Sequence, residues 1–169
     1  MLMQRTLRLS SIISRLEKPA TTLLPRVNTY RLPLPQSQTR TMSDLKTFNT
    51  KNAAQPVGPY SQAMIAGPHI FVSGQIPADA SGKLVEGSIA DKTKASCESV
   101  KAILEAAGSS IDRVIKTTVF LTSMGDFAEM NGVYEKYFAH KPSRSCVAVK
   151  ELPKGVPVEI ECIALSGSA

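Results

Sequence analysis

Short apolar runs bounded by turn residues predict five strands after residue 42. The first two, 63–66 and 69–75, are joined by the turn pair Gly67-Pro68. Residues 114–122 are rich in β-branched and aromatic side chains, which favours a buried strand. The last two strands, 144–150 and 157–164, flank a Leu-Pro-Lys-Gly connection.

Two further segments carry apolar residues at helical spacing. The first begins after Ser88, which forms an acidic variant of the capping box with Asp91, and Gly108 ends it. Its apolar stripe comprises Ile89, Thr93, Cys97, Val100, Ile103, Leu104 and Ala107. Ser123 and Asp126 are expected to cap the second helix, whose inward face is expected to carry Phe127, Met130, Tyr134, Tyr137 and Phe138.

The predicted element order is therefore ββ-α-β-α-ββ, which indicates an α/β (α+β) fold with a mixed sheet. Right-handed strand–helix–strand crossovers place both helices on one face of such a sheet. The opposite face carries mixed rather than charged residues. We expect it to be buried against other copies of the chain.

Charge divides the chain into two predicted regions, 1–41 and 42–169. Residues 1–41 hold seven basic residues against the single acid Glu17, so they carry the whole net charge of +6. The domain at 42–169 is neutral, which argues against a nucleic-acid partner, because binding to phosphates needs a basic surface. No stretch approaches the roughly 20 apolar residues of a membrane span, so no membrane partner is expected.

Residues 1–41 have the composition of a mitochondrial transit peptide, rich in Arg, Ser and Thr and poor in acids. Leu9, Ile12, Ile13 and Leu16 recur at helical spacing, and four prolines interrupt the remainder, so no fold is expected there. The alternative is a disordered basic arm that binds acidic partners. We predict a mitochondrial matrix protein, with a cytosolic form if Met42 is used as a second start.

The three cysteines, Cys97, Cys146 and Cys162, form no close pair and are odd in number. That pattern favours reduced thiols over a disulfide scaffold or a zinc ribbon. The two histidines, His69 and His140, do not complete a metal-binding spacing with them. We therefore expect no metal and no cofactor.

Arg144 is one of only two arginines after residue 41. Strand parity puts Arg144 and Cys146 on one face and Val147 and Val149 on the other. Because valines suit a helix-covered core, Arg144 and Cys146 are expected on the uncovered face. A guanidinium matches a carboxylate through two parallel hydrogen bonds. The alternative is a surface arginine in an ion pair.

Glu159 and Glu161 share one face of the last strand, roughly 7 Å apart by the strand rise. A partly buried carboxylate can act as an acid or base. The alternative is a charged guard on an exposed sheet edge.

Several motifs, in order across about residues 47–165, resemble the Rid family of reactive-intermediate (enamine/imine) deaminases, and its RidA subgroup most closely. They are Gly58-Pro-Tyr-Ser-Gln-Ala63, Ser73-Gly-Gln-Ile-Pro77, Lys116-Thr-Thr-Val-Phe-Leu121, Asn131-Gly-Val-Tyr134, Pro142-Ser-Arg-Ser-Cys-Val147 and Val158-Glu-Ile-Glu-Cys-Ile-Ala164. With the basic presequence, the chain resembles the fungal mitochondrial members, which are tied to isoleucine synthesis. Ser143, where the family often has alanine, and a short connection at 139–142 depart from the pattern.

The resemblance implies a chorismate-mutase-like fold and a homotrimer whose sheets form a central barrel, with clefts between subunits. It implies that Arg144 binds the substrate carboxylate and that Glu159 directs water and shuttles a proton. The positions expected to line the same cleft are Tyr60, Ser73, Gly74, Asn131 and Cys146.

The implied activity is hydrolysis of 2-iminobutanoate, 2-iminopropanoate and their enamine tautomers to 2-oxo acids and ammonia. Such imines are released by pyridoxal-phosphate dehydratases, so this hydrolysis would limit damage by reactive intermediates. Two alternatives stay open from the sequence. One is a ribonuclease or translation inhibitor, an activity also attached to this family. The other is a non-catalytic trimer that binds 2-oxo acids.

Overall fold

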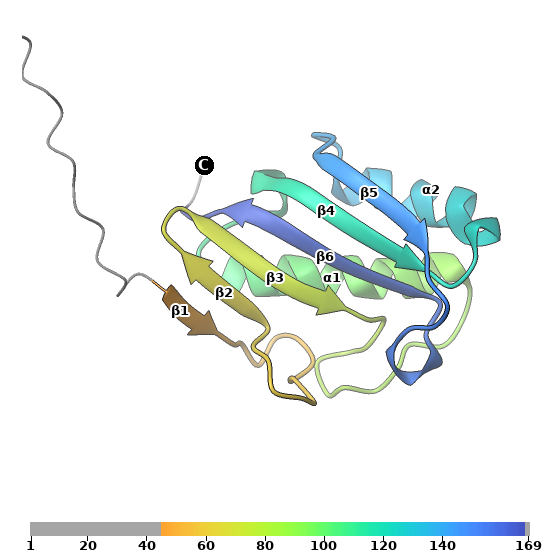
Figure 1. Ribbon diagram of the computed structural model, residues 1–169, viewed down its shortest axis with the longest axis horizontal. Coiled ribbons are helices and arrows are strands. Elements are labelled where there is room, and N and C mark those ends of the chain that lie inside the picture. The colour runs from red at the N-terminus through yellow and green to blue at the C-terminus, as the bar shows by residue number, and fades with distance from the viewer. Residues whose placement is uncertain (1–44, 168–169) are drawn as a thin grey trace, which may run out of the picture. The chain divides into compact units, whose positions relative to one another are not determined.

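A six-stranded sheet with two helices on one face organises the part of the chain that the computed structural model describes, residues 45–167 (Figure 1). The predicted transit segment, 1–41, lies outside the described residues. The strands are β1 (Leu45–Phe48), β2 (Ala63–Ala66), β3 (His69–Gln75), β4 (Val114–Leu121), β5 (Ser143–Ala148) and β6 (Val158–Leu165). The helices are α1 (Ile89–Ala106) and α2 (Phe127–Tyr137).

The strands lie in the order β1-β2-β3-β6-β4-β5. Neighbours are antiparallel except β4 and β5, which run parallel and are connected through α2. The predicted α/β class and both helices are confirmed. β2 and β3 have the predicted bounds, whereas the sequence pattern does not predict β1. That strand is a mostly exposed edge of only four residues, too short to show a burial period.

α1 begins where the local sequence signal places it, whereas the predicted side-chain cap of α2 by Asp126 is not formed. Ser88 Oγ accepts from the Asp91 N–H while the Asp91 carboxylate accepts from the Ser88 N–H, which completes the capping box of α1. Gly108, just past the end of α1, has φ of +77°, a conformation that favours glycine. Before α2, Ser123 caps a short 3₁₀ turn, and the Asp126 side chain makes no capping hydrogen bond.

The core lies between the sheet and the helices. It contains the fully buried side chains of Ile70, Val100, Leu104, Val119 and Ile160, with Met130 and Phe138 from α2 and the chain that follows it. One polar pair crosses this layer, because the Thr117 hydroxyl on β4 and the Tyr134 hydroxyl on α2 lie 2.7 Å apart. That pair fixes α2 over β4, which places the residues of α2 beside β5.

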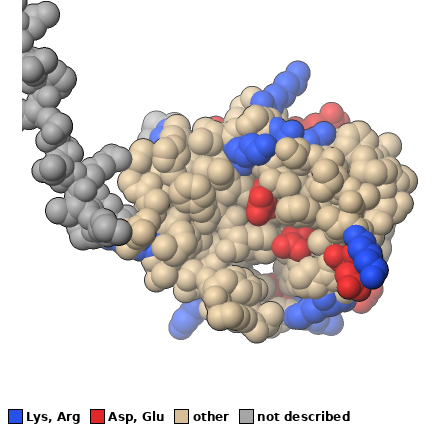
Figure 2. Space-filling view, in the orientation of Figure 1, with Lys and Arg blue, Asp and Glu red and all other residues tan. Residues whose placement is uncertain are grey.

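The opposite face of the sheet is uncovered within the described residues. Figure 2 shows this face to be mostly uncharged, with few acidic and basic side chains on it. Phe71 on β3 is 43% exposed and Val147 on β5 is 45% exposed. An apolar sheet face of this kind agrees with the expectation that another surface covers it.

Candidate active site

Arg144 lies on the helix-covered side of the sheet, so the prediction that it faces the uncovered side is wrong. β5 pairs in parallel with β4, and Arg144 stands beside the buried Thr117, whose side chain points to α2. Cys146, beside Val119, also points to the helix side, and Val147 points away from it. The prediction assigned the valine-bearing face of β5 to the helix-covered core. It was wrong because the uncovered face is itself apolar at the β5 edge.

Residues of α2 hold the Arg144 guanidinium in place. Arg144 Nη1 donates to Asn131 Oδ1 over 2.7 Å. The guanidinium carbon lies 4.6 Å from the centroid of the Tyr134 ring and 5.6 Å from that of Phe127. Stacking on aromatic rings and one neutral hydrogen bond orient the cation without neutralising its charge.

No carboxylate of residues 45–167 pairs with Arg144, since the one ion pair found there joins Lys101 to Glu105. The guanidinium is half-buried and lines a cleft of about 490 Å³ with Asn131, Tyr134, Glu135, Phe138, Lys141 and Pro142. An arginine has five N–H donors in a rigid fork, and only one of them is engaged here. The cleft can therefore accept an organic anion on the free side of the fork.

Glu159 occupies a second cavity, of about 300 Å³, on the uncovered side of the sheet. It lies beside Gly74, where a β-bulge adds one residue to β3 between its pairs with Cys162 and Ile160 of β6. A Cβ at Gly74 would stand 1.7 Å from Glu159 Oε1, so only glycine admits the carboxylate there. Burial, and then the negative charge of Glu161, raise the pKa of Glu159 above its ordinary value.

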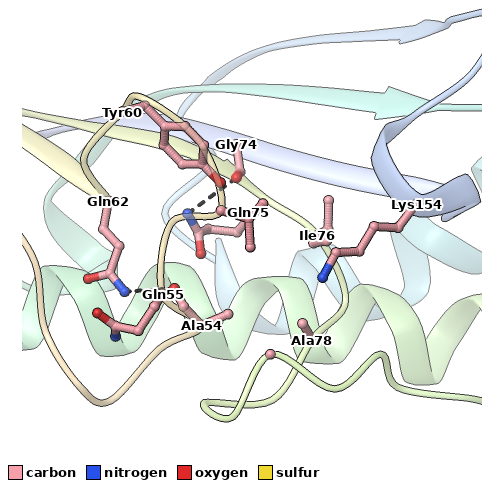
Figure 3. A pocket seen from close by; sticks show the side chains of 11 residues that line it. Ala54, Gln55, Tyr60, Gln62, Gly74, Gln75, Ile76, Ala78 and Lys154 are labelled. Atoms are coloured by element: carbon pink, nitrogen blue, oxygen red, sulfur yellow. Dashed lines mark hydrogen bonds between the residues drawn. The ribbon is translucent and has the colours of Figure 1, made fainter.

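Tyr60 and Ser73 line the same cavity as Glu159 and Gly74. The Ser73 hydroxyl donates to the Ser61 carbonyl over 2.7 Å, and this bond ties the β3 bulge to the loop that carries Tyr60. Figure 3 shows the Tyr60 ring reaching over the cavity with its hydroxyl directed toward Gly74. Four of the predicted site residues are thus brought together on one copy of the chain.

The other predicted site residues belong to a separate half. Arg144 and Asn131 line the cleft beside α2, whereas Glu159 is paired with Phe120 on the uncovered face of the sheet. The sheet lies between them, so one copy of the chain does not present both groups to a single small molecule. This separation was not foreseen from the sequence, because the side assigned to Arg144 was wrong.

Cys146 is half-buried near Arg144 but does not line either cavity. Burial raises the pKa of its thiol, although the positive charge of Arg144 opposes that effect. A thiol with a raised pKa is a poor nucleophile, which suits a structural role for Cys146. Cys97 and Cys162 are buried free thiols, and burial raises the pKa of each to about 12.

Residues 45–167 contain no cluster of histidine, cysteine or acidic side chains that could hold a metal ion. Among the helices described, none is both long and apolar enough to span a bilayer. Two lysines that the sequence pattern does not predict also line the cavities, Lys141 in the cleft of Arg144 and Lys154 in the cavity of Glu159. Both have positive φ, and lysine gives no sequence signal for that conformation.

Comparison with known proteins identifies relatives over the whole domain. The family model described as endoribonuclease L-PSP matches residues 50–166. A RutC family protein of Pyrococcus horikoshii is 55% identical over 117 residues, which cover 68% of this chain and 93% of that protein. The 2-iminobutanoate/2-iminopropanoate deaminase of Salmonella typhimurium is 44% identical, covering 71% and 97% of the two chains. The mitochondrial protein MMF1 of Saccharomyces cerevisiae is 46% identical, covering 75% and 88%.

Solved structures show the same fold. The crystal structure of yeast Mmf1 aligns with a TM-score of 0.71 at 46% identity, covering 72% of this chain and 98% of that one. The crystal structure of Escherichia coli TdcF with bound serine aligns with a TM-score of 0.68 at 42% identity, covering 72% and 99%. The resemblance predicted from the motifs is confirmed: the chain belongs to the Rid family, to which the endoribonuclease L-PSP model also assigns it.

Proposed function

We propose that this protein hydrolyses 2-imino acids, with 2-iminobutanoate and 2-iminopropanoate and their enamine tautomers as substrates. The observation that carries the proposal is the state of Arg144, a half-buried guanidinium with no carboxylate partner among residues 45–167 and with an open cleft in front of it. The name of the Salmonella relative supports the reaction, and the serine bound to TdcF supports a small carboxylate-bearing ligand at such a protein.

In the proposed reaction, Arg144 binds the substrate carboxylate and fixes the position of C2. The Glu159 carboxylate accepts a proton from a water molecule, whose oxygen adds to C2 of the C=N bond. That proton passes to nitrogen and gives a carbinolamine. The hydroxyl proton of this adduct is then transferred to the amino nitrogen, the C–N bond breaks, and ammonia leaves as the C2=O bond of the 2-oxo acid forms. The raised pKa of Glu159 suits both proton transfers, because a general base works best when its pKa is close to the working pH.

Because Arg144 and Glu159 lie on opposite sides of the sheet, we propose that each complete site forms between two copies of a homotrimer. β5 is an edge strand, so the Arg144 cleft stands at a border that another copy can reach. The uncovered sheet face, with Phe71 and Val147 exposed, supplies the apolar surface that the assembly would bury. A closed ring of three copies then contains three equivalent sites.

We further propose that residues 1–41 direct the chain to the mitochondrial matrix, with the deaminase domain at 42–169. The composition of the segment supports this, as does the mitochondrial name of the MMF1 relative. In the matrix the enzyme would remove imines released by a dehydratase that acts on threonine, and so support isoleucine synthesis.

A competition assay tests the activity. A threonine dehydratase releases 2-iminobutanoate in the presence of semicarbazide, which traps the imine, and residues 42–169 are added to the mixture. We expect wild type to reduce semicarbazone formation and Arg144→Ala to have no effect. Lys94→Ala, which removes an exposed cation of α1 outside both cavities, should behave like wild type.

Unchanged trapping in the presence of folded, wild-type protein would refute imine hydrolysis. If that protein nevertheless binds 2-oxobutanoate, and Arg144→Ala abolishes the binding, the function would instead be that of a 2-oxo-acid-binding protein. RNA cleavage that persists through purification and needs Arg144 would support the ribonuclease alternative.

A further inference from the structure

Lys154 is a second cation at the proposed site: it is exposed and lines the same cavity as Glu159. It belongs to the 3₁₀ turn Pro153–Gly155, which follows β5 and precedes β6. Figure 3 shows its side chain extending from this turn over Ile76, with the amine directed toward Ala78. Tyr60 reaches the cavity from the opposite side.

The Glu159 cavity continues into a smaller hollow of about 50 Å³. The two spaces share the lining residues Val57, Tyr60, Gly74, Ile76 and Lys154. Since about 10–15 Å³ of such space admits one water molecule, the hollow has room for a group of a few atoms. A ligand whose reacting carbon lies near Glu159 can therefore extend its far end into the hollow.

The hollow is lined by both apolar and polar groups, and Lys154 supplies its single charge. Its other polar side chains are the neutral Gln55, Tyr60, Gln62 and Gln75, and no acidic residue lines it. Lys154 forms no ion pair with any carboxylate of residues 45–167. The ammonium is thus an unneutralised cation at the end of a neutral hollow.

The backbone of Lys154 has φ of +56°, in the left-handed region that favours glycine. An L-residue with a side chain is strained there. Gly155, also at positive φ, follows directly, and Lys154 lines the cavity from this turn. Strained residues of this kind concentrate at ligand sites, where the surrounding structure maintains them.

We propose that Lys154 binds a second carboxylate of the substrate and extends the activity to dicarboxylic 2-imino acids, the imines of four- and five-carbon amino acids. This inference rests on the proposed function. Arg144 would bind the carboxylate next to C2, Glu159 would direct water at C2, and Lys154 would bind the distal carboxylate in the hollow. The chemistry is unchanged: water adds to C2, the C–N bond breaks, and ammonia leaves with no oxidant or reductant.

The test measures binding of two stable product analogues to the 42–169 protein by calorimetry. 2-Oxoglutarate carries the distal carboxylate, and 2-oxopentanoate has the same number of carbons without it. We expect wild type to bind 2-oxoglutarate about fivefold more tightly, the range of one partly exposed ion pair. Lys154→Met should remove the preference, Lys154→Arg should keep it, and Lys94→Met should leave it unchanged.

The same variants are then assayed for hydrolysis of the imines generated from glutamate and from 2-aminopentanoate by an amino-acid oxidase. Lys154→Met should lower kcat/KM about fivefold for the dicarboxylic imine and leave the monocarboxylic one within twofold. An equal effect on both ligands, or none on either, would overturn the role of Lys154. Arg144→Ala, which should weaken both ligands alike, separates this outcome from failure of the proposed function. If the proposed function itself fails, neither imine would be hydrolysed by wild type or by any variant at residue 154.

Discussion

Gly74 and Glu159 are coupled at the level of single atoms. A methyl group at Gly74 would stand 1.7 Å from Glu159 Oε1 and 2.7 Å from its carboxyl carbon. These atoms are the far end of a flexible side chain, so the fold can accommodate alanine by moving the carboxylate. A displacement of about 1 Å at a catalytic group can lower the rate by roughly 100-fold.

We therefore predict that Gly74→Ala lowers kcat by roughly 100-fold while the protein stays folded by circular dichroism. In a Glu159→Gln background the same change should have almost no further effect on kcat, because the displaced group is already inactive. A double-mutant cycle measures this coupling. Additive effects of the two substitutions would show that Gly74 acts independently of Glu159.

The ionisation of Glu159 predicts how activity depends on pH. Burial, with the adjacent charge of Glu161, raises its pKa, and the proposed base must be ionised to accept a proton. As pH falls, kcat/KM should therefore decline at a higher pH than an ordinary glutamate would give. Glu161→Gln removes the second cause, so the decline should move to lower pH. An unchanged profile in Glu161→Gln would exclude Glu159 as the titrating base.

The raised pKa of Glu159 also affects the stability of the fold, which should fall as pH rises and the carboxylate ionises. A carboxyl group whose pKa is raised by folding destabilises the fold when it is ionised, above the raised value, and this penalty is lost as pH falls through it. At pH 8, Glu159→Gln should therefore stabilise the domain. The gain should shrink as pH falls and Glu159 becomes protonated, as urea titrations at pH 8 and in acid can measure.

At the scale of elements, α2 has two tasks, covering the core and holding Arg144. Tyr134 performs both, because its hydroxyl pairs with the buried Thr117 and its ring lies under the guanidinium. We predict that Tyr134→Phe costs about 1–3 kcal/mol of stability, since the Thr117 hydroxyl stays buried without a partner. Its KM should change little, because the ring remains under Arg144.

Tyr134→Leu separates the two tasks, because it removes the ring as well as the hydroxyl. It should raise KM several-fold, in line with a loss of about 1 kcal/mol of cation–π interaction. Equal KM values for the phenylalanine and leucine variants would show that the ring does not position Arg144. Steady-state kinetics on both proteins, with urea unfolding, distinguishes these outcomes.

The elements that the sequence predicts well are those whose signals are local. The α1 capping box, the Gly67-Pro68 turn and the apolar runs of β2, β3 and β4 need no knowledge of the rest of the chain. The side on which Arg144 lies is different, because parity gives two alternatives and only the pairing with Thr117 selects one. Valine could not decide between them, since both sides of the β5 edge carry apolar residues. The positive φ of Lys154 depends on its turn and has no local signal either.

At the scale of the whole molecule, the position of the two half-sites makes a single chain insufficient. Arg144 and Glu159 lie on opposite sides of one sheet, and they line separate cavities. If each site takes Arg144 from one copy and Glu159 from its neighbour, variants damaged in different halves should complement each other. Variants damaged in the same half should not.

We predict that co-expressed Arg144→Ala and Glu159→Gln chains, each inactive alone, recover about a quarter of wild-type activity when equal amounts assemble at random into a closed ring. Each interface then has one chance in two of an intact arginine on one side and one in two of an intact glutamate on the other. Arg144→Ala with Arg144→Glu should recover nothing, because no chain in that mixture has an intact arginine half. Affinity tags on each chain verify that mixed trimers form. If mixed trimers of Arg144→Ala and Glu159→Gln chains recover no activity, both Arg144 and Glu159 of each site would belong to one chain.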